Sequence, residues 1–376
     1  MTTTVQEVTT TRPVPQPITL EVSSREKLLM SIRGSHVTIP DLQSMISHWP
    51  QKVHPELNKL EEYVQESLNS VMRSSKDKNR IRALQKTNIA LFGASWWPFA
   101  PYDALRIGTH LGMWLFAWDD ETDSIEYSTV IHDWDTASAF RQETVEYLRQ
   151  SLSKDPNPNL SEISTDPIIT FFRPIGEAFA RASNDRQIKG FLDELLFYMK
   201  MCGEEQRFQL TDQFPTIEEY LRIRMGSGGA RVCMSTIEYG YGITLPEEVV
   251  KDRTMQQVLH EASLVICITN DILSVKKEVE QSQVDSLVPL LCLQLGSIQE
   301  AMNRAAEMVR SAIERLDAGE KQILDRYSST PEVQEDIRKF IDGCKYACMA
   351  NLNWSLVSGR YKLNCQSMSG GLNITL

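Results

Sequence analysis

Apolar residues recur at steps of three and four along most of this chain, and this period restricts the fold to packed helices. The pattern is plain in one early and one late stretch: Leu57, Leu60, Tyr63, Val64 and Leu68, and then Met302, Ala305, Val309, Ile313 and Leu316. Nothing alternates with a period of two between regularly spaced turns, as the strands of a sandwich or barrel would. We therefore predict an all-α fold.

Length and composition favour one large helical domain. The chain has 376 residues, 41% hydrophobic and 24% charged, and can bury a substantial core. Length alone would allow two or three domains. We expect one, over residues 25–365, because amphipathic stretches with few prolines run through that region. Residues 1–24, rich in threonine and proline, are predicted to be a flexible leader, and residues 366–376 a loose tail.

An acidic cluster ends the most apolar of these stretches. Asp119, Asp120, Glu121 and Asp123 follow directly on residues 111–118. The C-terminus of a helix carries partial negative charge, so a cluster of carboxylates is unfavourable there unless a cation neutralises both the helix end and the carboxylates. At about 100° per residue, Asp119 and Asp123 share one face and Asp120 points elsewhere. We expect Asp119 and Asp123 to bind Mg²⁺, with Asp120 supporting them; a solvated surface cluster is the alternative.

A second set of oxygen-bearing side chains has helical spacing. Asn270, Ser274 and Glu278 stand four residues apart, so their amide, hydroxyl and carboxylate oxygens form one stripe along a helix. All three are hard ligands of the kind that Mg²⁺ prefers. A polar stripe on an exposed helix is the alternative, but the combination with the first cluster favours a second magnesium site.

These two motifs, with Arg360-Tyr361 near the C-terminus, resemble those of class I terpene synthases of the fungal sesquiterpene cyclase type. The resemblance covers about residues 90–361 and implies a single-domain helical bundle around a central apolar cavity. It also implies a lyase that ionises farnesyl diphosphate and cyclises the carbocation to a sesquiterpene hydrocarbon or alcohol, releasing diphosphate. Three Mg²⁺ ions are expected, held by Asp119, Asp123, Asn270, Ser274 and Glu278.

The resemblance assigns further residues to the substrate. Arg224 occupies the position of the diphosphate-sensing arginine of the family. Ser227 and Gly228 match the linker and effector positions that help to trigger ionisation. The groups expected to bind the diphosphate are Arg224, Arg360 and Tyr361. Lys277 is a further candidate for binding it, with a solvated side chain as the alternative.

Aromatic side chains are expected to line the apolar part of the cavity, where a migrating positive charge is attracted to ring faces. Phe116 lies about one turn before Asp119 on the same face, and Trp354 lies about two turns before Tyr361. The family also places aromatic residues at these two positions. Further candidates with less to separate them are Phe92, Trp96 and Trp97.

Composition excludes several other classes of protein. The net charge is −11, with 39 basic and 50 acidic residues, and this argues against nucleic-acid binding. The seven cysteines show no CxxC pair, which is typical of a reducing compartment. There is no secretory signal pattern and no apolar run long enough for a membrane span. We expect a cytoplasmic protein, monomeric or homodimeric.

Several functions remain as alternatives to the sesquiterpene cyclase. One is a diterpene synthase acting on geranylgeranyl diphosphate, and another is a chain-elongating prenyltransferase on the same fold. Prenyltransferases carry a second aspartate-rich motif where this chain has Asn270, which favours cyclisation. An inactive helical binding protein is the non-enzymatic alternative. A protonation-initiated cyclase is disfavoured because the sequence contains no DxDD motif.

Overall fold

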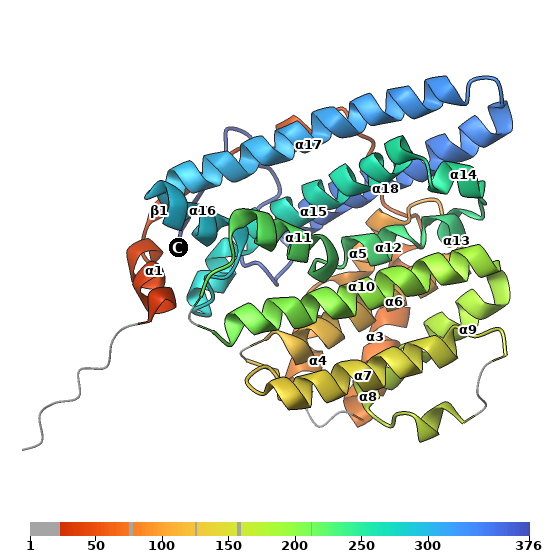
Figure 1. The fold of residues 1–376 in the computed structure, drawn as a ribbon, viewed down its shortest axis with the longest axis horizontal. Coiled ribbons are helices and arrows are strands. Elements are labelled where there is room, and N and C mark those ends of the chain that lie inside the picture. The colour runs from red at the N-terminus through yellow and green to blue at the C-terminus, as the bar shows by residue number, and fades with distance from the viewer. Residues whose placement is uncertain (1–22, 75–77, 125, 156–158, 212) are drawn as a thin grey trace, which may run out of the picture.

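Helices make up most of the part of the chain that the structure, a computed structural model, describes: residues 23–74, 78–124, 126–155, 159–211 and 213–376 (Figure 1). Of the predicted leader, residues 1–24, residues 1–22 lie outside the described part of the chain. The first half contains α1 (Ser24–Ile32), β1 (His36–Ile39), α2 (Leu42–Met45), α3 (Leu57–Ser74), α4 (Lys78–Gln85), α5 (Ile89–Trp96), α6 (Tyr102–Thr122), α7 (Trp134–Ser151), the 3₁₀ turn η1 (Leu160–Glu162), α8 (Pro167–Thr170) and α9 (Arg173–Ala182). The second half contains α10 (Asp185–Gln209), α11 (Ile217–Ser227), α12 (Ala230–Met234), α13 (Ile237–Tyr241), α14 (Glu247–Val250), α15 (Arg253–Glu280), α16 (Leu287–Leu295), α17 (Ile298–Arg326), α18 (Pro331–Val357) and β2 (Leu372–Thr375).

Side-chain caps fix the starts of α10 and α11, two of the helices that line the cavity described below. Asn184 forms a capping box with Gln187 before α10, and Thr216 forms another with Glu219 before α11. Each box satisfies backbone N–H groups that a helix N-terminus leaves unpaired. The register of α10 and α11, and therefore the direction of their cavity-facing side chains, is set locally.

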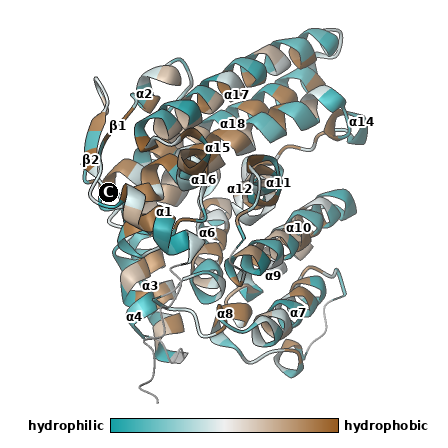
Figure 2. Ribbon diagram, turned by 60° about the vertical axis from the view of Figure 1, so that its left-hand side comes forward, coloured by the Kyte–Doolittle hydropathy of each residue, from teal (hydrophilic) through white to brown (hydrophobic). Residues whose placement is uncertain are grey.

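The helix α15 runs through the middle of the molecule. It packs against α17, α16 and α18 on one side and against α11 and α12 on another (Figure 1). Apolar residues gather on the inward faces of these helices (Figure 2). By length and composition α15 could cross a membrane, but 78% of its most apolar window is buried inside the protein. It has the character of the core helix of a folded domain.

The end of the chain differs from the predicted loose tail. Residues of β2 pair antiparallel with β1, from His36 opposite Thr375 to Ile39 opposite Leu372. Gln299 of α17 extends this pairing, because its amide donates to the Thr38 carbonyl at 2.9 Å and accepts from the Thr38 N–H at 2.8 Å. The tail prediction is therefore wrong for these residues. Backbone pairing with a segment distant in sequence orders them.

Candidate active site

A cavity opens between α5, α6, α10, α11, α12, α15 and α18. The empty volume of the cavity, including its open mouth, is about 1080 Å³. Its lining combines charged and polar side chains with aromatic and apolar ones. Both predicted motifs face this one space. The lining includes Asp119, Asp123, Glu205, Arg224, Ser227, Asn270, Ser274, Lys277, Glu278, Arg360 and Tyr361.

The acids of the first motif have different partners. Asp119, in the last turn of α6, and Asp123, its C-cap residue, both line the cavity, as helical spacing predicts. Asp120 is buried and instead accepts a hydrogen bond from Arg360 Nη2 at 3.1 Å. Glu121 is also buried, and it pairs with Arg80 of α4. Two of the four acids therefore remain facing the cavity.

The two cavity-facing acids repel one another. Burial, and next the neighbouring Asp123 carboxylate, raise the pKa of Asp119 to about 7, although Arg360 and Arg224 oppose this shift. The side chain of Asp119 is 38% exposed, but that surface faces the cavity and remains surrounded by protein. Asp123 accepts a hydrogen bond from Gln209 Nε2 at 2.5 Å. A cation bound to Asp119 and Asp123 would remove the remaining repulsion between their carboxylates.

The second motif lies on one face of α15, and its side chains are hydrogen-bonded. The Ser274 hydroxyl donates to Glu278 Oε1 at 2.5 Å, and the Ser286 hydroxyl donates to Glu278 Oε2 at 2.5 Å. Burial, and next Asp271, raise the pKa of Glu278. The amide oxygen of Asn270 accepts from Arg224 Nη2 at 2.8 Å. The predicted stripe exists, and its oxygens contact one another and Arg224.

Asp271 holds Arg224, a role that sequence reasoning missed. Its Oδ1 lies 3.0 Å from Arg224 Nε, and its Oδ2 accepts from the Tyr220 hydroxyl at 2.7 Å. The Asp271 side chain is 1% exposed, so it points away from the cavity. A charged residue in the apolar run of α15 was the available signal, because buried charges require partners.

Arg360 and Tyr361 connect the two motifs. Arg360 Nη2 lies 3.1 Å from Asp120 Oδ1 and 3.6 Å from Asp119 Oδ2. The next residue, Tyr361, accepts a hydrogen bond at its hydroxyl from Asn270 Nδ2 at 2.7 Å. A continuous set of contacts therefore runs from the end of α6 through the C-terminal pair to α15 and Arg224.

The helix that carries Arg224, α11, ends at Ser227, and Gly228 and Gly229 separate it from α12. Gly229 has φ +66°, which a side chain would strain, and a Cβ on Gly228 would lie 2.5 Å from Cys267 Sγ. Both positions therefore require glycine. Ser227 is buried and lines the cavity, and its hydroxyl has no hydrogen-bond partner among the described residues.

Lys277 also lines the cavity, between the two ends of the second motif. Burial, and next the nearby Arg360, lower its pKa. Its ammonium group forms no ion pair with the described residues. With Arg224 and Arg360, it gives the mouth three cationic side chains.

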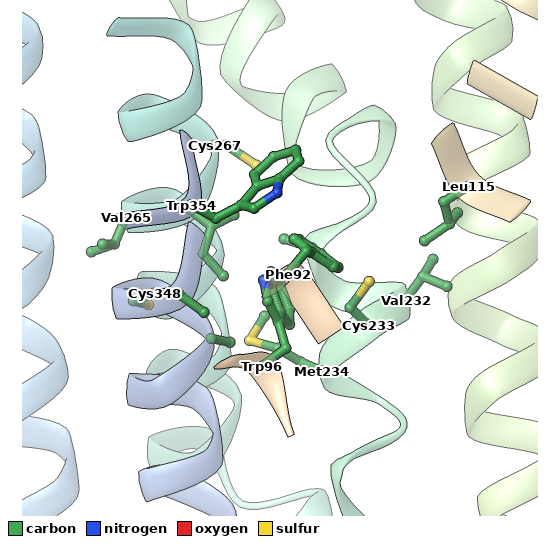
Figure 3. Close-up of a cluster of buried hydrophobic side chains, with 14 of the residues drawn as sticks. Phe92, Trp96, Leu115, Val232, Cys233, Met234, Val265, Cys267, Cys348 and Trp354 are labelled. Carbon is green, nitrogen blue, oxygen red and sulfur yellow. The ribbon is translucent and has the colours of Figure 1, made fainter. Parts of the chain in front are cut away.

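An aromatic cluster closes the inner end of the cavity. Figure 3 shows Phe92 and Trp96 of α5 gathered near Trp354 of α18, with Leu115 and Cys233 on another side. The ring centroid of Phe116 lies 5.6 Å from that of Phe92 and 5.4 Å from that of Trp354. The structure thus brings four of the five predicted aromatic residues together at the cavity. Trp97 is the exception: it packs against Phe92 and Trp96 but does not line the cavity, and its indole N–H donates to the Thr236 hydroxyl.

Glu205 of α10 is a further cavity residue that sequence reasoning missed. Burial, and next the Asp123 carboxylate, raise its pKa to about 8, while Arg224 opposes the shift. Nothing in the local sequence separates Glu205 from its neighbour Glu204, which does not line the cavity and pairs with Arg207. Only its direction on α10 distinguishes it.

The residues at the mouth suit a hard divalent cation. Both walls offer oxygen donors alone: carboxylates on α6, and an amide, a hydroxyl and a carboxylate on α15. Among the described residues, no group of three His, Cys, Asp or Glu side chains could hold a metal alone. Mg²⁺ commonly binds through one or two carboxylates and completes its shell with water and substrate phosphates. The donor set therefore fits Mg²⁺ shared between protein and a phosphate-bearing ligand.

Comparisons with known proteins agree with this geometry. The family model of terpene synthase family 2, C-terminal metal binding, matches residues 110–315. The sesquiterpene cyclase hepA of Aspergillus oryzae is 29% identical over 349 residues, 91% of this chain and 93% of hepA. The terpene cyclase braA of Annulohypoxylon truncatum is 25% identical, covering 90% of each chain.

Solved structures show the same architecture. A cucumene synthase variant superimposes with a TM-score of 0.70 at 18% identity, covering 84% of this chain and 99% of the variant. Hedycaryol synthase superimposes with a TM-score of 0.67 at 19% identity, covering 81% and 95%. The predicted all-α class I terpenoid synthase fold is confirmed.

Proposed function

This chain belongs to terpene synthase family 2, and on that premise we propose that it is a Mg²⁺-dependent sesquiterpene cyclase acting on farnesyl diphosphate. Membership makes it a terpene cyclase, a lyase that cyclises a prenyl diphosphate with a divalent metal. The choice of farnesyl diphosphate is supported by relatives such as hepA, which is named a sesquiterpene cyclase. The choice of Mg²⁺ is supported by the two sets of oxygen donors, on α6 and on α15, and the number of three ions comes from the family resemblance alone.

The metal would be held by Asp119 and Asp123 on one wall and by Asn270, Ser274 and Glu278 on the other. Bound Mg²⁺ supplies neutralisation of the diphosphate charge, which makes diphosphate a good leaving group. Asp120 supports this site indirectly, because it orients Arg360.

Cationic side chains at the mouth would bind the diphosphate oxygens. Arg224 and Arg360 are each oriented by a buried aspartate, and Lys277 has no competing ion pair among the described residues. Tyr361 adds a hydroxyl. Preoriented charges of this kind stabilise the negative charge that develops as the allylic C–O bond breaks. The Ser227-Gly228 turn, next to Arg224, would present its backbone to the same group.

The inner cavity would protect and steer the cation. Its aromatic wall offers little to compete as a nucleophile and excludes bulk water. The rings of Phe116 and Trp354 lie within 5.4 Å of each other and can stabilise positive charge through their faces.

The observation that carries this proposal is the continuous set of contacts joining both motifs through Arg360 and Tyr361 over one aromatic cavity. The test is incubation of the protein with farnesyl diphosphate and Mg²⁺, followed by headspace gas chromatography and mass spectrometry. A cyclic fifteen-carbon hydrocarbon or alcohol is expected, and it should disappear with EDTA. Product from geranylgeranyl diphosphate alone, a longer diphosphate, or no product would contradict the proposal.

A further inference from the structure

Glu205 lies between the two parts of the mouth that must act together. Its position on α10 places it among the cavity-lining residues with Asp123 on the α6 side and Ser227 on the α11 side. The charges that act on its carboxyl group identify its neighbours: Asp123 and Asp119 repel it, and Arg224 attracts it. It is therefore close both to the first metal wall and to the diphosphate-sensing arginine.

The Ser227 hydroxyl supplies an independent observation. It is 5% exposed, lines the same cavity, and has no hydrogen-bond partner of normal geometry among the described residues. Buried hydroxyl groups are almost always paired, because an unpaired one costs free energy. Ser227 is also the donor that acts on the carboxyl group of Glu205. The two groups are neighbours that do not yet form a well-shaped hydrogen bond.

The charge of the first motif acts on the same carboxyl group of Glu205. Without a cation, the Asp119 and Asp123 carboxylates repel a third negative charge nearby. A cation at that wall removes the repulsion, so a carboxylate at Glu205 becomes a good acceptor for the Ser227 hydroxyl. Ser227 lies three residues after Arg224 and directly before Gly228. A bond to Ser227 therefore holds the turn that presents Arg224.

We propose that Glu205 is a positioning residue that couples metal binding to diphosphate binding by accepting a hydrogen bond from Ser227 and fixing the Arg224–Gly228 turn. The inference rests on the proposed function, because it requires both a cation and a diphosphate. It gives α10, which already supplies Gln209 to Asp123, a second residue at the mouth.

The test is calorimetric titration of inorganic diphosphate, in excess Mg²⁺, into the wild type, E205L, E205Q, S227A and the double variant E205L/S227A. E205L and S227A should each weaken binding by about tenfold, the loss expected for one charge-assisted hydrogen bond. The double variant should be no weaker than either single variant, because both remove the same bond. E205Q, whose amide oxygen still accepts, should bind within about threefold of the wild type.

Glu204 provides the matched control, because it lies next to Glu205 on α10 but pairs with Arg207 at the surface. E204L should bind diphosphate as the wild type does. Wild-type binding that does not depend on Mg²⁺ would overturn the proposed function together with this inference. Mg²⁺-dependent wild-type binding that is unchanged in S227A, or losses that add in the double variant, would overturn the inference alone. If E205L fails to fold, S227A and E205Q still decide the question. The inference requires that S227A bind diphosphate more weakly than the wild type and that E205Q bind it almost as tightly.

Discussion

The two oxygen-rich walls of the cavity differ in how their side chains are stabilised without a cation. On α6, Asp119 and Asp123 face each other's charge, and the pKa of Asp119 is raised to about 7. On α15, the Ser274, Ser286 and Glu278 side chains satisfy one another with hydrogen bonds of 2.5 Å. The first wall therefore gains by binding a cation, whereas the second must exchange existing hydrogen bonds for it.

Helix ends and available hydrogen-bond donors together account for this difference. Asp119 and Asp123 occupy the last turn and the C-cap of α6, where unpaired carbonyl groups add to the negative charge. Asn270 and Ser274 lie inside the 28-residue helix α15, and Glu278, in its last turn, accepts from two hydroxyl groups. The first wall supplies the electrostatic drive for metal binding, and the second supplies a rigid frame.

The largest expected effect is on the first wall. Asp119→Ala should lower kcat/KM for farnesyl diphosphate by about 10²–10³-fold or more, because it removes a metal ligand that stabilises the leaving group. Product formation measured by mass spectrometry checks this. Asp103→Ala, an exposed acid in the first turn of the same helix, is the control and should retain wild-type activity. Near-normal activity of Asp119→Ala would remove the metal assignment.

On the second wall, Asp271→Asn should mainly reduce stability. It leaves the buried guanidinium of Arg224 without its charged partner, so the free energy of unfolding should fall by about 2–4 kcal/mol. Urea denaturation followed by circular dichroism measures this. Glu261→Gln on the same helix should cost less, about 1 kcal/mol, because its partner Arg315 is half exposed. Equal losses in the two variants would show that Asp271 has no special function.

The pH dependence of stability should report on the acids at and beside the first wall. Asp119 and Glu205, with pKa values of about 7 and 8, hold more protons when folded than when unfolded. The free energy of unfolding of the metal-free protein should therefore fall as pH rises from about 4 to about 8. Because Mg²⁺ favours the ionised forms, its binding should release protons and tighten over the upper part of this range. Denaturation with EDTA and with Mg²⁺ at several pH values tests this, and Asp119→Asn combined with Glu205→Gln should flatten the metal-free profile. If the stability of the metal-free wild type does not change with pH over this range, the pKa values of Asp119 and Glu205 are not raised as described.

The smallest effect on rate is expected in the aromatic interior. Phe116→Leu should change the product mixture while altering diphosphate release by no more than about threefold, because the ring stabilises the cation after ionisation. Chromatography of the products and a diphosphate-release assay provide the two readouts. Phe179→Leu, the same change in a buried ring that stacks on Phe191 outside the cavity lining, serves as the control and should leave the mixture unchanged. An unaltered mixture for Phe116→Leu would assign this ring to core packing.

Much of the site could be predicted because its elements are helices. Helical spacing alone places Asp119 with Asp123, turns Asp120 away, and aligns Asn270, Ser274 and Glu278. The same reasoning failed where a partner was distant in sequence. Four-residue strands give no reliable periodic signal, so the pairing of β2 with β1 was not foreseen.

The sequence by itself determined the helices, the two oxygen-bearing stripes and the family, because each depends on local spacing along one helix. Tertiary structure alone decided which acids face the cavity and which are buried in ion pairs outside it, because that depends on contacts between helices. Asp120 and Glu121 are paired by Arg360 and Arg80, whereas Glu205 joins the mouth from α10. A carboxylate's role follows from the charges and hydrogen-bond donors around it, and packing brings those together from segments far apart in the chain.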